Sequence, residues 1–464
     1  MIKVIRRGSL IIPKDDQFLC NMIKDQLTRT FKSYNSSVIE TWSFYIEDDN
    51  FLYLPKFYPI GDWVGFKLVD EREDGLDIDI EHNIKPRSEL QEKALEYMIS
   101  HDQGIINLDT GEGKTVISIA AISEIKKKTL ILLHRANLVE QWISRIEEFT
   151  NIKLGKDMVI LKNTRIEKSF EKSIVVATVQ TLRSALERKK NDLIMALKKA
   201  RFGLVLSDEI HTTVGAKKFS ECSLFLPVKK IFGLSATPYR RDGTSDILTY
   251  HLGPIYKPEG KSGTMNVNVT VMFFDFGLLP RYEKYLYWGD SFQRSRYLNL
   301  LKNSKILYNV CMGILDKFKE NRSVFLIAER VKFIQLLYKK FLYDDKNTFI
   351  QKDTNKNLES QFVFATPGKI RDGIDAPEKD ALILTSPIGN IQQACGRVRR
   401  PTENKKMPVV VDLVDIGCSD ISKTLYYRLR FYNSKNWNIK YYHLKGGKVL
   451  PVEESDIKEL LNSK

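Results

Sequence analysis

The sequence has few cysteines and no long hydrophobic run. Its five cysteines, Cys20, Cys222, Cys311, Cys395 and Cys418, include no C-x-x-C pair. This scatter argues against a disulfide framework or a thiolate zinc site, and it fits the reducing cytoplasm. No stretch approaches the roughly 20 apolar residues that a membrane span needs, and the apolar run at 9–13 is too short for a signal peptide. We therefore expect a cytoplasmic protein with no membrane partner.

Acidic residues are fewer than basic ones. The 464 residues carry 73 Lys and Arg against 58 Asp and Glu, which gives a formal net charge of +15. Such an excess attracts polyanions, so nucleic acid is the natural partner, although many basic proteins are charged in this way merely for solubility. The chain is long enough for several domains, because single cores seldom grow much past about 250 to 300 residues.

The hydrophobic pattern predicts α/β domains and divides the chain into four parts. Residues 1–80 contain short aromatic-rich runs broken by Pro, Gly and Asp, which is typical of a small α+β domain with hairpins. Residues 81–255 and 301–464 alternate apolar runs with amphipathic stretches, which predicts two doubly wound parallel-sheet domains. Residues 256–300 are rich in Gly and Pro, and we expect the interdomain linker there. The expected strands lie at 105–108, 130–133, 174–177, 204–206, 231–234, 324–328, 362–365, 381–384 and 409–412.

A glycine-rich segment follows the first of these strands and precedes a helical stretch. It consists of Thr110, Gly111, Glu112, Gly113, Lys114 and Thr115. Glycines let backbone amides close around phosphates, Lys114 can reach the β and γ phosphates, and Thr115 can bind Mg²⁺. The strand, loop and helix context favours an ATP site over a surface turn, although Leu108 stands where the general P-loop has another glycine.

Two adjacent carboxylates end the strand at 204–206. Asp208 and Glu209 lie at a strand's carboxyl end, where ligands gather in open α/β sheets. Asp208 can hold Mg²⁺, partly through water, and Glu209 can deprotonate the attacking water. A solvated acidic turn is the alternative, but the pair's spacing from the glycine-rich segment favours one ATP-hydrolysing site.

Together with S-A-T-P at 235–238, these motifs resemble superfamily 2 helicases, which are built from two RecA-like domains. The resemblance continues in order through 133–142 (LHRANLVEQW), 176–182 (VATVQTL), 364–375 (FATPGKIRDGID) and 392–400 (QQACGRVRR), and it covers about 85–415. An ordered set of this kind is highly specific. The resemblance implies an ATP-driven, Mg²⁺-dependent motor on nucleic acid.

The resemblance also implies roles for individual residues. Gln393, Arg397 and Arg400, spaced around Gly396, match the motif whose arginines reach from the second domain to the ATP on the first. The resemblance implies further nucleotide contacts for Arg87, Gln91, Gly373 and Asp375. It implies that the ATP site is coupled to the nucleic acid through His211, Ser235 and Thr237. It implies DNA contacts for Arg135, Thr178, Gln180 and Thr366.

Residues 233–243 and 252–256 are similar to the XPB and phage UvsW-type branch, whose members remodel duplex or branched DNA. This similarity implies a monomeric phage helicase, acting in the host cytoplasm, that unwinds forks and junctions and drives branch migration in recombination, replication or repair. A duplex translocase that separates no strands, an RNA helicase and a degenerate binding protein are the alternatives. The preserved Lys114, Glu209 and Arg397 argue against the last of these.

Two aromatic-rich regions lie outside the motor motifs. In the N-terminal part, Trp42, Tyr45, Tyr53 and Trp63 can either stack on exposed bases at a DNA branch or form the small domain's own core. At the C-terminus, aromatic and basic residues interleave over 426–442, and the same two interpretations stay open. A shortened stretch over 348–364 predicts that the second domain lacks a helix there or has an abbreviated one.

Overall fold

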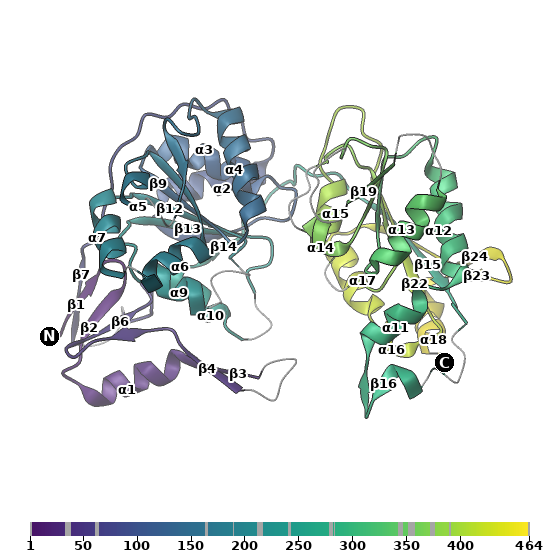
Figure 1. The fold of residues 1–464 in the computed structure, drawn as a ribbon, viewed down its shortest axis with the longest axis horizontal. Helices are drawn as coiled ribbons and strands as arrows, with labels where there is room; N and C mark the ends of the chain where they lie inside the picture. Colours follow the sequence, from purple (N-terminus) through teal and green to yellow (C-terminus); the bar gives the residue numbers. More distant parts are fainter. Residues whose placement is uncertain are drawn as a thin grey trace. The chain divides into compact units, whose positions relative to one another are not determined.

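The computed structural model describes the chain in two compact units, Met1–Gly263 and Thr264–Lys464 (Figure 1). It describes all residues except 1, 33–38, 61–64, 163–165, 189, 211–216, 240–242, 278–281, 283, 342–346, 351–357, 372–375, 389–390 and 463–464. Each unit contains a mainly parallel sheet between helices, so the predicted α/β class with two RecA-like domains and a small N-terminal α+β domain is confirmed.

The first unit contains a parallel sheet with the order β10-β11-β9-β12-β13-β8-β14. Its strands are β8 (Gln103–Asn107), β9 (Thr129–Leu133), β10 (Met158–Ile160), β11 (Ile174–Thr178), β12 (Leu204–Asp208), β13 (Lys230–Ser235) and β14 (Ile255–Tyr256). Because both faces are buried, the central strands are continuous apolar runs, which is why the sequence pattern located them.

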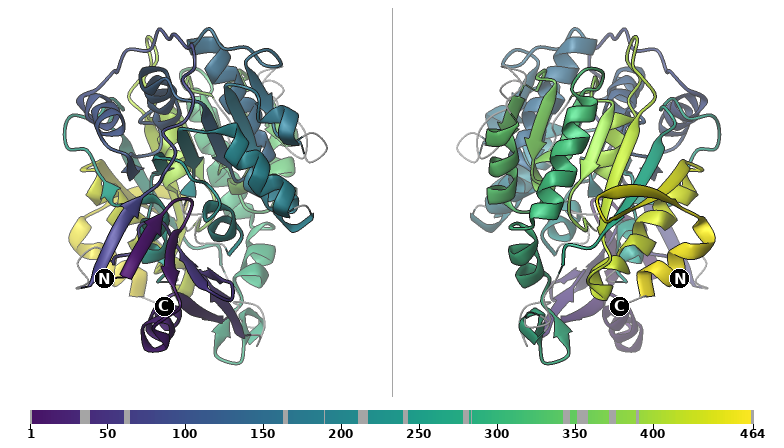
Figure 2. Two further views of the ribbon diagram at one scale, coloured as in Figure 1. Left: turned by 90° about the vertical axis from the view of Figure 1, so that its left-hand side faces the viewer. Right: turned by 90° about the vertical axis from the view of Figure 1, so that its right-hand side faces the viewer.

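Helices cover both faces of this sheet (Figure 2). They are α2 (Glu89–Ser100), α3 (Lys114–Ile125), α4 (Ala136–Phe149), α5 (Ile166–Ser169), α6 (Val179–Arg188), α7 (Lys190–Ala200), α9 (Lys217–Ser223) and α10 (Ser245–Leu252). Buried residues of α2, α3 and α4 form one core with Ile131 and Leu206, and those of α6, α7 and α10 form another with Leu130 and Val205. Successive residues of a strand therefore serve opposite faces.

The N-terminal domain is a five-stranded sheet with one helix and a separate hairpin. The sheet has the order β5-β6-β2-β1-β7. Its elements are β1 (Ile2–Arg6), β2 (Leu10–Pro13), α1 (Gln17–Gln26), β5 (Ile46–Glu47), β6 (Phe51–Leu54) and β7 (Phe66–Asp70), and the hairpin is β3 (Thr28–Lys32) with β4 (Ile39–Ser43). Trp42 and Tyr45 are partly buried and pack against the domain's core, which favours the core interpretation for both.

This domain shares its core with the first RecA-like domain. Ile247 of α10 is fully buried in the N-terminal core, and the ring of Tyr250 meets Tyr58 edge to face at 5.3 Å. The Nζ atom of Lys56, which is buried, donates to the carbonyl of Leu226 at 2.7 Å, and burial lowers the pKa of Lys56 to about 7. The two domains therefore form one packed body.

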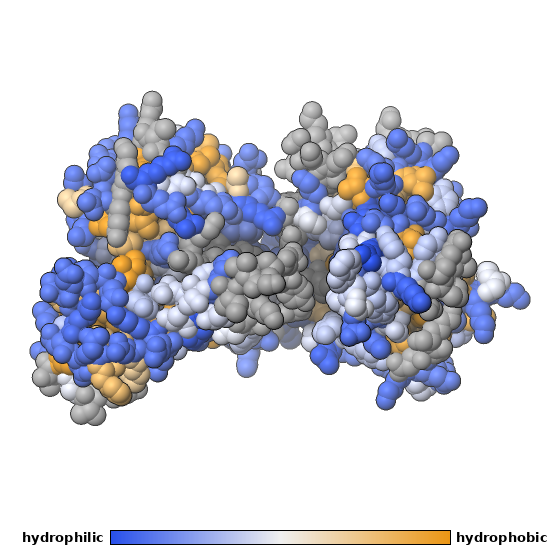
Figure 3. All heavy atoms as spheres, turned by 60° about the horizontal axis from the view of Figure 1, so that its bottom comes forward, coloured by the Kyte–Doolittle hydropathy of each residue, from blue (hydrophilic) through white to orange (hydrophobic). Residues whose placement is uncertain are grey.

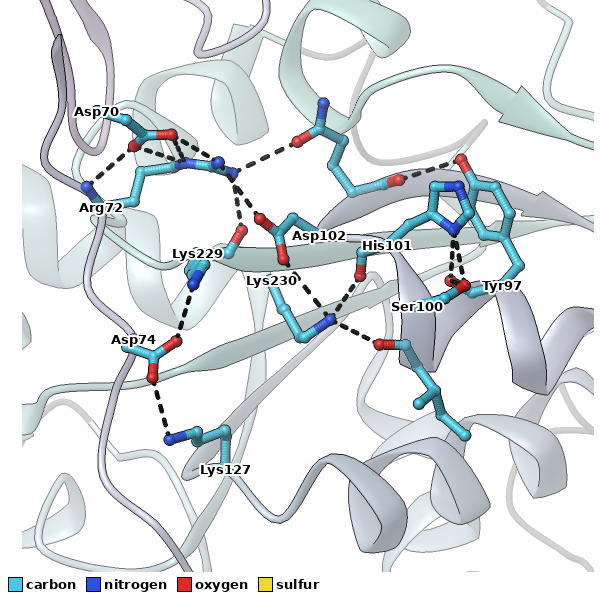
Figure 4. A network of polar contacts seen from close by, with 12 residues as sticks. Asp70, Arg72, Asp74, Tyr97, Ser100, His101, Asp102, Lys127, Lys229 and Lys230 are labelled. Atoms are coloured by element: carbon cyan, nitrogen blue, oxygen red, sulfur yellow. Dashed lines mark hydrogen bonds and ion pairs between the residues drawn. The ribbon is translucent and has the colours of Figure 1, made fainter.

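A polar network extends this junction along the amino ends of the strands (Figure 4). The guanidinium of Arg72 binds Asp70 of β7 at 2.7 Å and donates to the carbonyl of Lys229, just before β13, at 2.9 Å. Asp74 pairs with Lys127 at 3.3 Å and with Lys229 at 3.3 Å. This network lies away from the carboxyl ends of the strands and holds the N-terminal domain in place.

We expect removal of residues 2–70 to destabilise the remaining first unit. The deletion exposes Ile247 and Tyr250, and exposing a buried apolar side chain costs about 1.5–3 kcal/mol. The midpoint of thermal unfolding should fall by about 5 °C or more. Phe18→Ala is the matched control, since Phe18 is 82% exposed and its removal should leave the midpoint unchanged. An unchanged midpoint in the truncated protein would show that the shared core contributes little.

The second unit contains an eight-stranded sheet with the order β19-β20-β18-β21-β22-β15-β23-β24. Its strands are β15 (Asn268–Phe274), β18 (Val324–Ile327), β19 (Asn347–Ile350), β20 (Phe362–Ala365), β21 (Ala381–Leu384), β22 (Val409–Asp415), β23 (Asn438–Lys445) and β24 (Lys448–Val452). All neighbours pair in parallel except β23 and β24. Between β19 and β20, residues 351–357 lie outside the described chain, and the described residues 358–361 form no helix.

Helices of this unit form two layers (Figure 2). They are α11 (Arg294–Leu301), α12 (Lys305–Phe318), α13 (Val331–Lys340), α14 (Pro367–Arg371), α15 (Gln392–Val398), α16 (Ser419–Ser422), α17 (Leu425–Ser434) and α18 (Ile457–Asn462), with 3-10 turns η2 (Lys284–Leu286) and η3 (Glu454–Asp456) and a hairpin of β16 (Tyr287–Trp288) and β17 (Ser291–Phe292). One core joins α11–α13 to the sheet, and the other joins α15, α17 and α18.

The segment 256–300, expected as a linker, instead contributes to both sheets. β14 belongs to the first sheet, β15 pairs with β22 and β23 in the second, and the units divide between Gly263 and Thr264. The C-terminal aromatic region also forms core, since Tyr432 and Trp437 are buried and Arg428 pairs with Asp412 at 2.7 Å. Tyr427, by contrast, is 62% exposed.

The described surface is mainly hydrophilic on the face shown in Figure 3, where hydrophobic side chains appear in small separate areas. Among the described helices, none is both long enough and apolar enough to cross a membrane. All five cysteines are buried, and none of them forms a disulfide.

Candidate functional site

The carboxyl ends of three neighbouring strands bring the predicted ATP-site motifs together. β13 lies between β12 and β8, with Asp208 opposite Leu234 and Ser235 opposite Asn107. The glycine-rich segment follows β8, the acidic pair ends β12, and 235–237 follows β13. Because all three strands are parallel, these segments meet at one edge of the sheet.

The glycine-rich segment has the backbone of a phosphate-binding loop. Gly111 and Gly113 have φ values of 96° and 79°, in the region that favours glycine, and Gly113 caps the start of α3. The ammonium of Lys114 donates to the carbonyls of Leu108 at 3.0 Å and Asp109 at 3.2 Å, so it lies across the loop. A positive helix N-terminus and a lysine beside open backbone amides suit the phosphates of a nucleotide.

Gln91 is held against this loop. Its Nε2 donates to the carbonyl of Glu112 at 2.8 Å, while its Oε1 accepts from the backbone amide of Arg87 at 2.7 Å. A Cβ atom on Gly113 would lie 2.7 Å from the Gln91 Nε2, at the end of a flexible side chain, so glycine is favoured there mainly by the φ of 79°. Gln91 is buried and Arg87 is exposed. The structure thus brings the predicted glutamine to the loop, with Arg87 at its solvent side.

Asp208 is buried at the end of β12 and is held by a residue that the sequence did not single out. The indole Nε1 of Trp142, on α4, donates to Asp208 Oδ2 at 2.9 Å, and the amide of Glu209 donates to Asp208 Oδ1 at 2.8 Å. Burial, reinforced by the charge of Glu209, raises the pKa of Asp208 to about 6. Glu209 has a φ of 51°, a strained value that often marks functional sites.

We expect ATP turnover to fall as the pH drops through about 6, where Asp208 becomes protonated and loses its affinity for Mg²⁺. The effect on folding has the opposite sign. A carboxyl whose pKa is raised above its unfolded value of about 3.9 destabilises the fold once it is ionised, so this contribution is relieved as the pH falls through the same window. Turnover measured from pH 8 to 5 at Mg²⁺ concentrations below saturation shows the first effect, and a melting curve at each pH shows the second.

The variant Trp142→Phe tests the indole contact. The hydrogen bond favours the ionised carboxyl, so its loss should move the acidic limb of the pH profile upward. Turnover at pH 6 should fall on the order of 10-fold relative to wild type, and less at pH 8. Because the variant and the wild type are compared at the same pH, protonation of ATP affects both rates equally. A uniform loss at every pH would mean that Trp142 acts only through packing.

A second contact that the sequence did not predict lies on the other side of the loop. The hydroxyl of Ser262, at the end of the first unit, donates to Glu112 Oε1, and Glu112 is buried. Nearby, the amide of Lys261 donates to Glu89 at 3.3 Å, and Lys93 donates to the carbonyl of Glu259 at 2.7 Å. Residues 259–262, at the end of the first unit, are therefore held by hydrogen bonds to the loop and to α2.

The same edge of the first sheet carries several of the residues predicted for coupling and DNA contact. The hydroxyl of Ser235 accepts from the amide of Thr237 at 3.1 Å. Thr178 caps α6, with its hydroxyl 2.8 Å from that of Thr181. Arg135 precedes α4, and Gln180, in α6, is exposed. Thr178 thus has a structural role as the cap of α6, independent of any contact with nucleic acid.

The second unit carries the remaining predicted residues. Gln393 and Arg397 lie on α15, Arg400 follows it, and Arg397 is 7% exposed. Thr366 is half-buried between β20 and α14, at the carboxyl edge of the second sheet. His211, Gly373 and Asp375 lie outside the described residues. The approach of Arg397 and Arg400 to the ATP site stays a prediction.

The residues present fit a magnesium nucleotide. The loop at 110–115 offers backbone amides and Lys114, while Asp208 and Thr115 supply the oxygen donors that Mg²⁺ prefers. A bound Mg²⁺ would neutralise phosphate charge at this edge. No cluster of three or more His, Cys, Asp or Glu suited to a metal occurs in the described parts of the chain.

Comparison with known proteins finds helicases among those similar to this chain. Residues 83–240 match the family described as type III restriction enzyme, res subunit. A protein of Acanthamoeba polyphaga mimivirus named as an ATP-dependent RNA helicase is 25% identical over 95% of this chain and 87% of its own length. The XPB helicase/translocase subunit of Schizosaccharomyces pombe is 25% identical over 74% of this chain and 45% of its length, and a protein of Escherichia phage T5 named as a helicase is 25% identical over 81% of each.

The fold agrees with that of a solved DNA-bound enzyme. The restriction-modification enzyme LlaBIII bound to DNA matches with a TM-score of 0.55 and 14% identity, over 82% of this chain and 32% of that one. T4 UvsW matches over 96% of this chain and 100% of that chain, with 16% identity and a TM-score of 0.38. The chain spans about half the length of XPB. In its ordered motifs and in these relatives, the chain is similar to superfamily 2 helicases of the XPB and UvsW-type group.

Proposed function

We propose that the protein is an ATP-driven motor that translocates on DNA and remodels forks and junctions. The observation that carries the proposal is the edge of the first sheet, where the phosphate-binding loop, the buried Asp208 with Glu209, and Ser235 lie side by side. A loop that binds phosphate and a carboxylate pair suited to activate water support hydrolysis of ATP.

In this proposal each residue of the ATP site has a distinct role in hydrolysis. Lys114 and the loop amides hold the phosphates, and Thr115 with Asp208 holds Mg²⁺. Glu209 removes a proton from the attacking water, and Arg397 and Arg400 stabilise the charge of the transferred phosphoryl group. Gln393 supports these arginines. ATP turnover would in this way drive closure of the two RecA-like domains.

Contacts to the nucleic acid are proposed for Arg135, Thr178, Gln180 and Thr366. Gripping phosphates positions a strand without reading its sequence, as a tracking motor requires. Discrimination among DNA shapes would then come from the N-terminal domain, which is fused to the first RecA-like domain through Ile247 and Lys56. That fusion makes deletion a poor test, because the deletion disturbs the motor as well.

Surface variants test the branch-reading role without disturbing the core. Phe18, on α1, is 82% exposed, and Tyr53 donates to Asp48 at 2.6 Å on the exposed side of β6. If the domain reads branches through either of these side chains, Phe18→Ala with Tyr53→Ala should lose preference for four-way junctions while keeping ATPase stimulated by simple duplex DNA. Unchanged junction preference would place the shape reader elsewhere.

One experiment separates the main alternatives. ATP turnover is measured with forked DNA, blunt duplex DNA and RNA of matched sequence, and strand separation is followed on gels. The proposal expects the largest stimulation by forked DNA together with strand separation. Stimulation by duplex without separation would indicate a duplex translocase, and stimulation by RNA alone would indicate an RNA helicase, the activity named for the mimivirus relative.

A further inference from the structure

An exposed aromatic cluster on the second unit has no part in the motor motifs. Trp288 is 73% exposed, Tyr285 is 45% exposed, and both come from the short segment of η2 and β16. The guanidinium carbon of Arg296, on α11, lies 5.1 Å from the ring centre of Tyr285 and 5.7 Å from that of Trp288. Two rings and one cation therefore share a small area of surface.

The cluster is held in place by packing and hydrogen bonds within the second unit. Leu286, between the two exposed rings in sequence, is buried in the core of the unit, and Phe292 packs against Tyr287 and Tyr297 with ring centres 5.7 and 6.2 Å apart. Arg296 also donates to the carbonyls of Tyr285 and Tyr287, at 2.9 and 3.2 Å. A four-residue hairpin alone is marginal in water, so these contacts hold the exposed rings in one arrangement. A preorganised surface loses little entropy when it binds.

The support continues to the carboxyl edge of the second sheet. Arg294 pairs with Glu329, just after β18, and donates to the carbonyl of Pro387, just after β21, at 2.6 Å. Arg330 donates to the carbonyl of Ser295 at 2.6 Å, and the hydroxyl of Tyr297 donates to Asp415, at the end of β22, at 2.8 Å. This is the edge that carries Thr366, proposed above for phosphate contact. In open α/β sheets ligands bind at this edge.

The chemistry of the cluster fits unpaired bases. A base offers a flat π face to an aromatic ring, while its phosphate offers a negative charge to a cation such as Arg296 or the exposed Lys284. Glu329 is paired with Arg294, and Asp420 accepts from the hydroxyl of Tyr287, so both nearby carboxylates have partners. Among the described residues 284–292, Asp290 in the hairpin turn is the remaining acidic group.

We propose that Tyr285, Trp288 and Arg296 form a stacking site for the bases of single-stranded nucleic acid. The proposal rests on the proposed function, in that a motor which opens duplexes must hold a freed strand. It assigns that task to a supported aromatic surface at the edge of the second sheet, outside the helicase motifs. Paired bases are already stacked on each other, so blunt duplex should engage the site much less.

Tryptophan fluorescence of the full chain, without nucleotide, tests the site directly. Among the described tryptophans, Trp142 and Trp437 are buried and Trp42 is partly buried, whereas Trp288 is 73% exposed, so stacking by oligothymidylate at the proposed site should quench Trp288. The quenching should largely disappear in Trp288→Phe, which still stacks, and persist in the matched control Trp42→Phe, which alters a partly buried tryptophan of the N-terminal domain.

Anisotropy of labelled oligothymidylate then measures affinity. Trp288→Ala should weaken binding by about 5- to 100-fold and Trp288→Phe by much less, while binding of blunt duplex changes by less than about 2-fold. Quenching that survives in Trp288→Phe, or unchanged affinity of Trp288→Ala for the single strand, would overturn the proposal. Failure of the wild type to bind any nucleic acid would instead overturn the proposed function, so the two failures are distinguishable.

Discussion

Glu209→Gln is expected to abolish nucleic-acid-stimulated ATP hydrolysis while leaving ATP binding largely intact. The substitution keeps the size of the side chain but removes the base that takes a proton from water, so turnover should fall by about 10²-fold or more. The strained backbone at Glu209, with a φ of 51°, tolerates glutamine as it does glutamate, so folding should be unaffected. Steady-state turnover and equilibrium binding of a fluorescent ATP analogue provide the two measurements.

Lys114→Ala is the companion variant, because it removes a phosphate contact rather than the base. It should lose hydrolysis and also weaken nucleotide binding, which distinguishes it from Glu209→Gln. The Lys114 ammonium now donates to the carbonyls of Leu108 and Asp109, and these carbonyls can turn to water once it is gone. Undiminished hydrolysis by purified Glu209→Gln protein would contradict the proposed chemistry.

Arg397→Ala and Arg400→Ala should each keep nucleotide binding and lose turnover by roughly 10²-fold or more, a loss short of or within the range of a missing arginine finger. The reason is that both arginines are proposed to meet the phosphoryl group only as it is transferred. Single-turnover hydrolysis in the presence of saturating DNA is the measurement. Near-normal rates in both variants would mean that the second domain does not complete the ATP site.

The neighbouring Arg399 offers a matched control for these two variants. Its Nε donates to the carbonyl of Met265 at 3.2 Å, and its guanidinium lies 5.4 Å from the ring centre of Trp437, so its contacts belong to the fold of the second unit. Arg399→Ala should therefore lower the melting temperature without lowering turnover per folded molecule. Because Arg397 is itself 7% exposed, its variant needs the same melting control.

The sequence predicted the parallel strands well because burial on both faces leaves a continuous apolar run, as at 204–206 and 381–384. It did not locate β15, which follows a stretch rich in Gly and Pro that reads as a connection. Strand β15 pairs with β22 and β23 across long intervals of chain, and such pairing leaves no local signature. The expected linker at 256–300 was too long for the same reason.

The candidate site, like the fold, could be predicted from the sequence only in part. The loop at 110–115 and the pair Asp208 and Glu209 were predictable, since phosphate and metal binding require those residue types at fixed spacing. The indole of Trp142 on Asp208 and the hydroxyl of Ser262 on Glu112 were not, because each contact joins elements that are distant in sequence. A tryptophan in an amphipathic helix normally indicates only core packing.

The most direct test of the motor is strand separation of a forked DNA followed on a gel with wild-type protein and with Glu209→Gln. The account predicts that wild-type protein releases the single strand only when hydrolysable ATP and Mg²⁺ are present. Glu209→Gln should bind the same fork with similar affinity and release nothing. Release of the strand by Glu209→Gln, or an ATPase of the wild type that no DNA stimulates, would contradict the central claim.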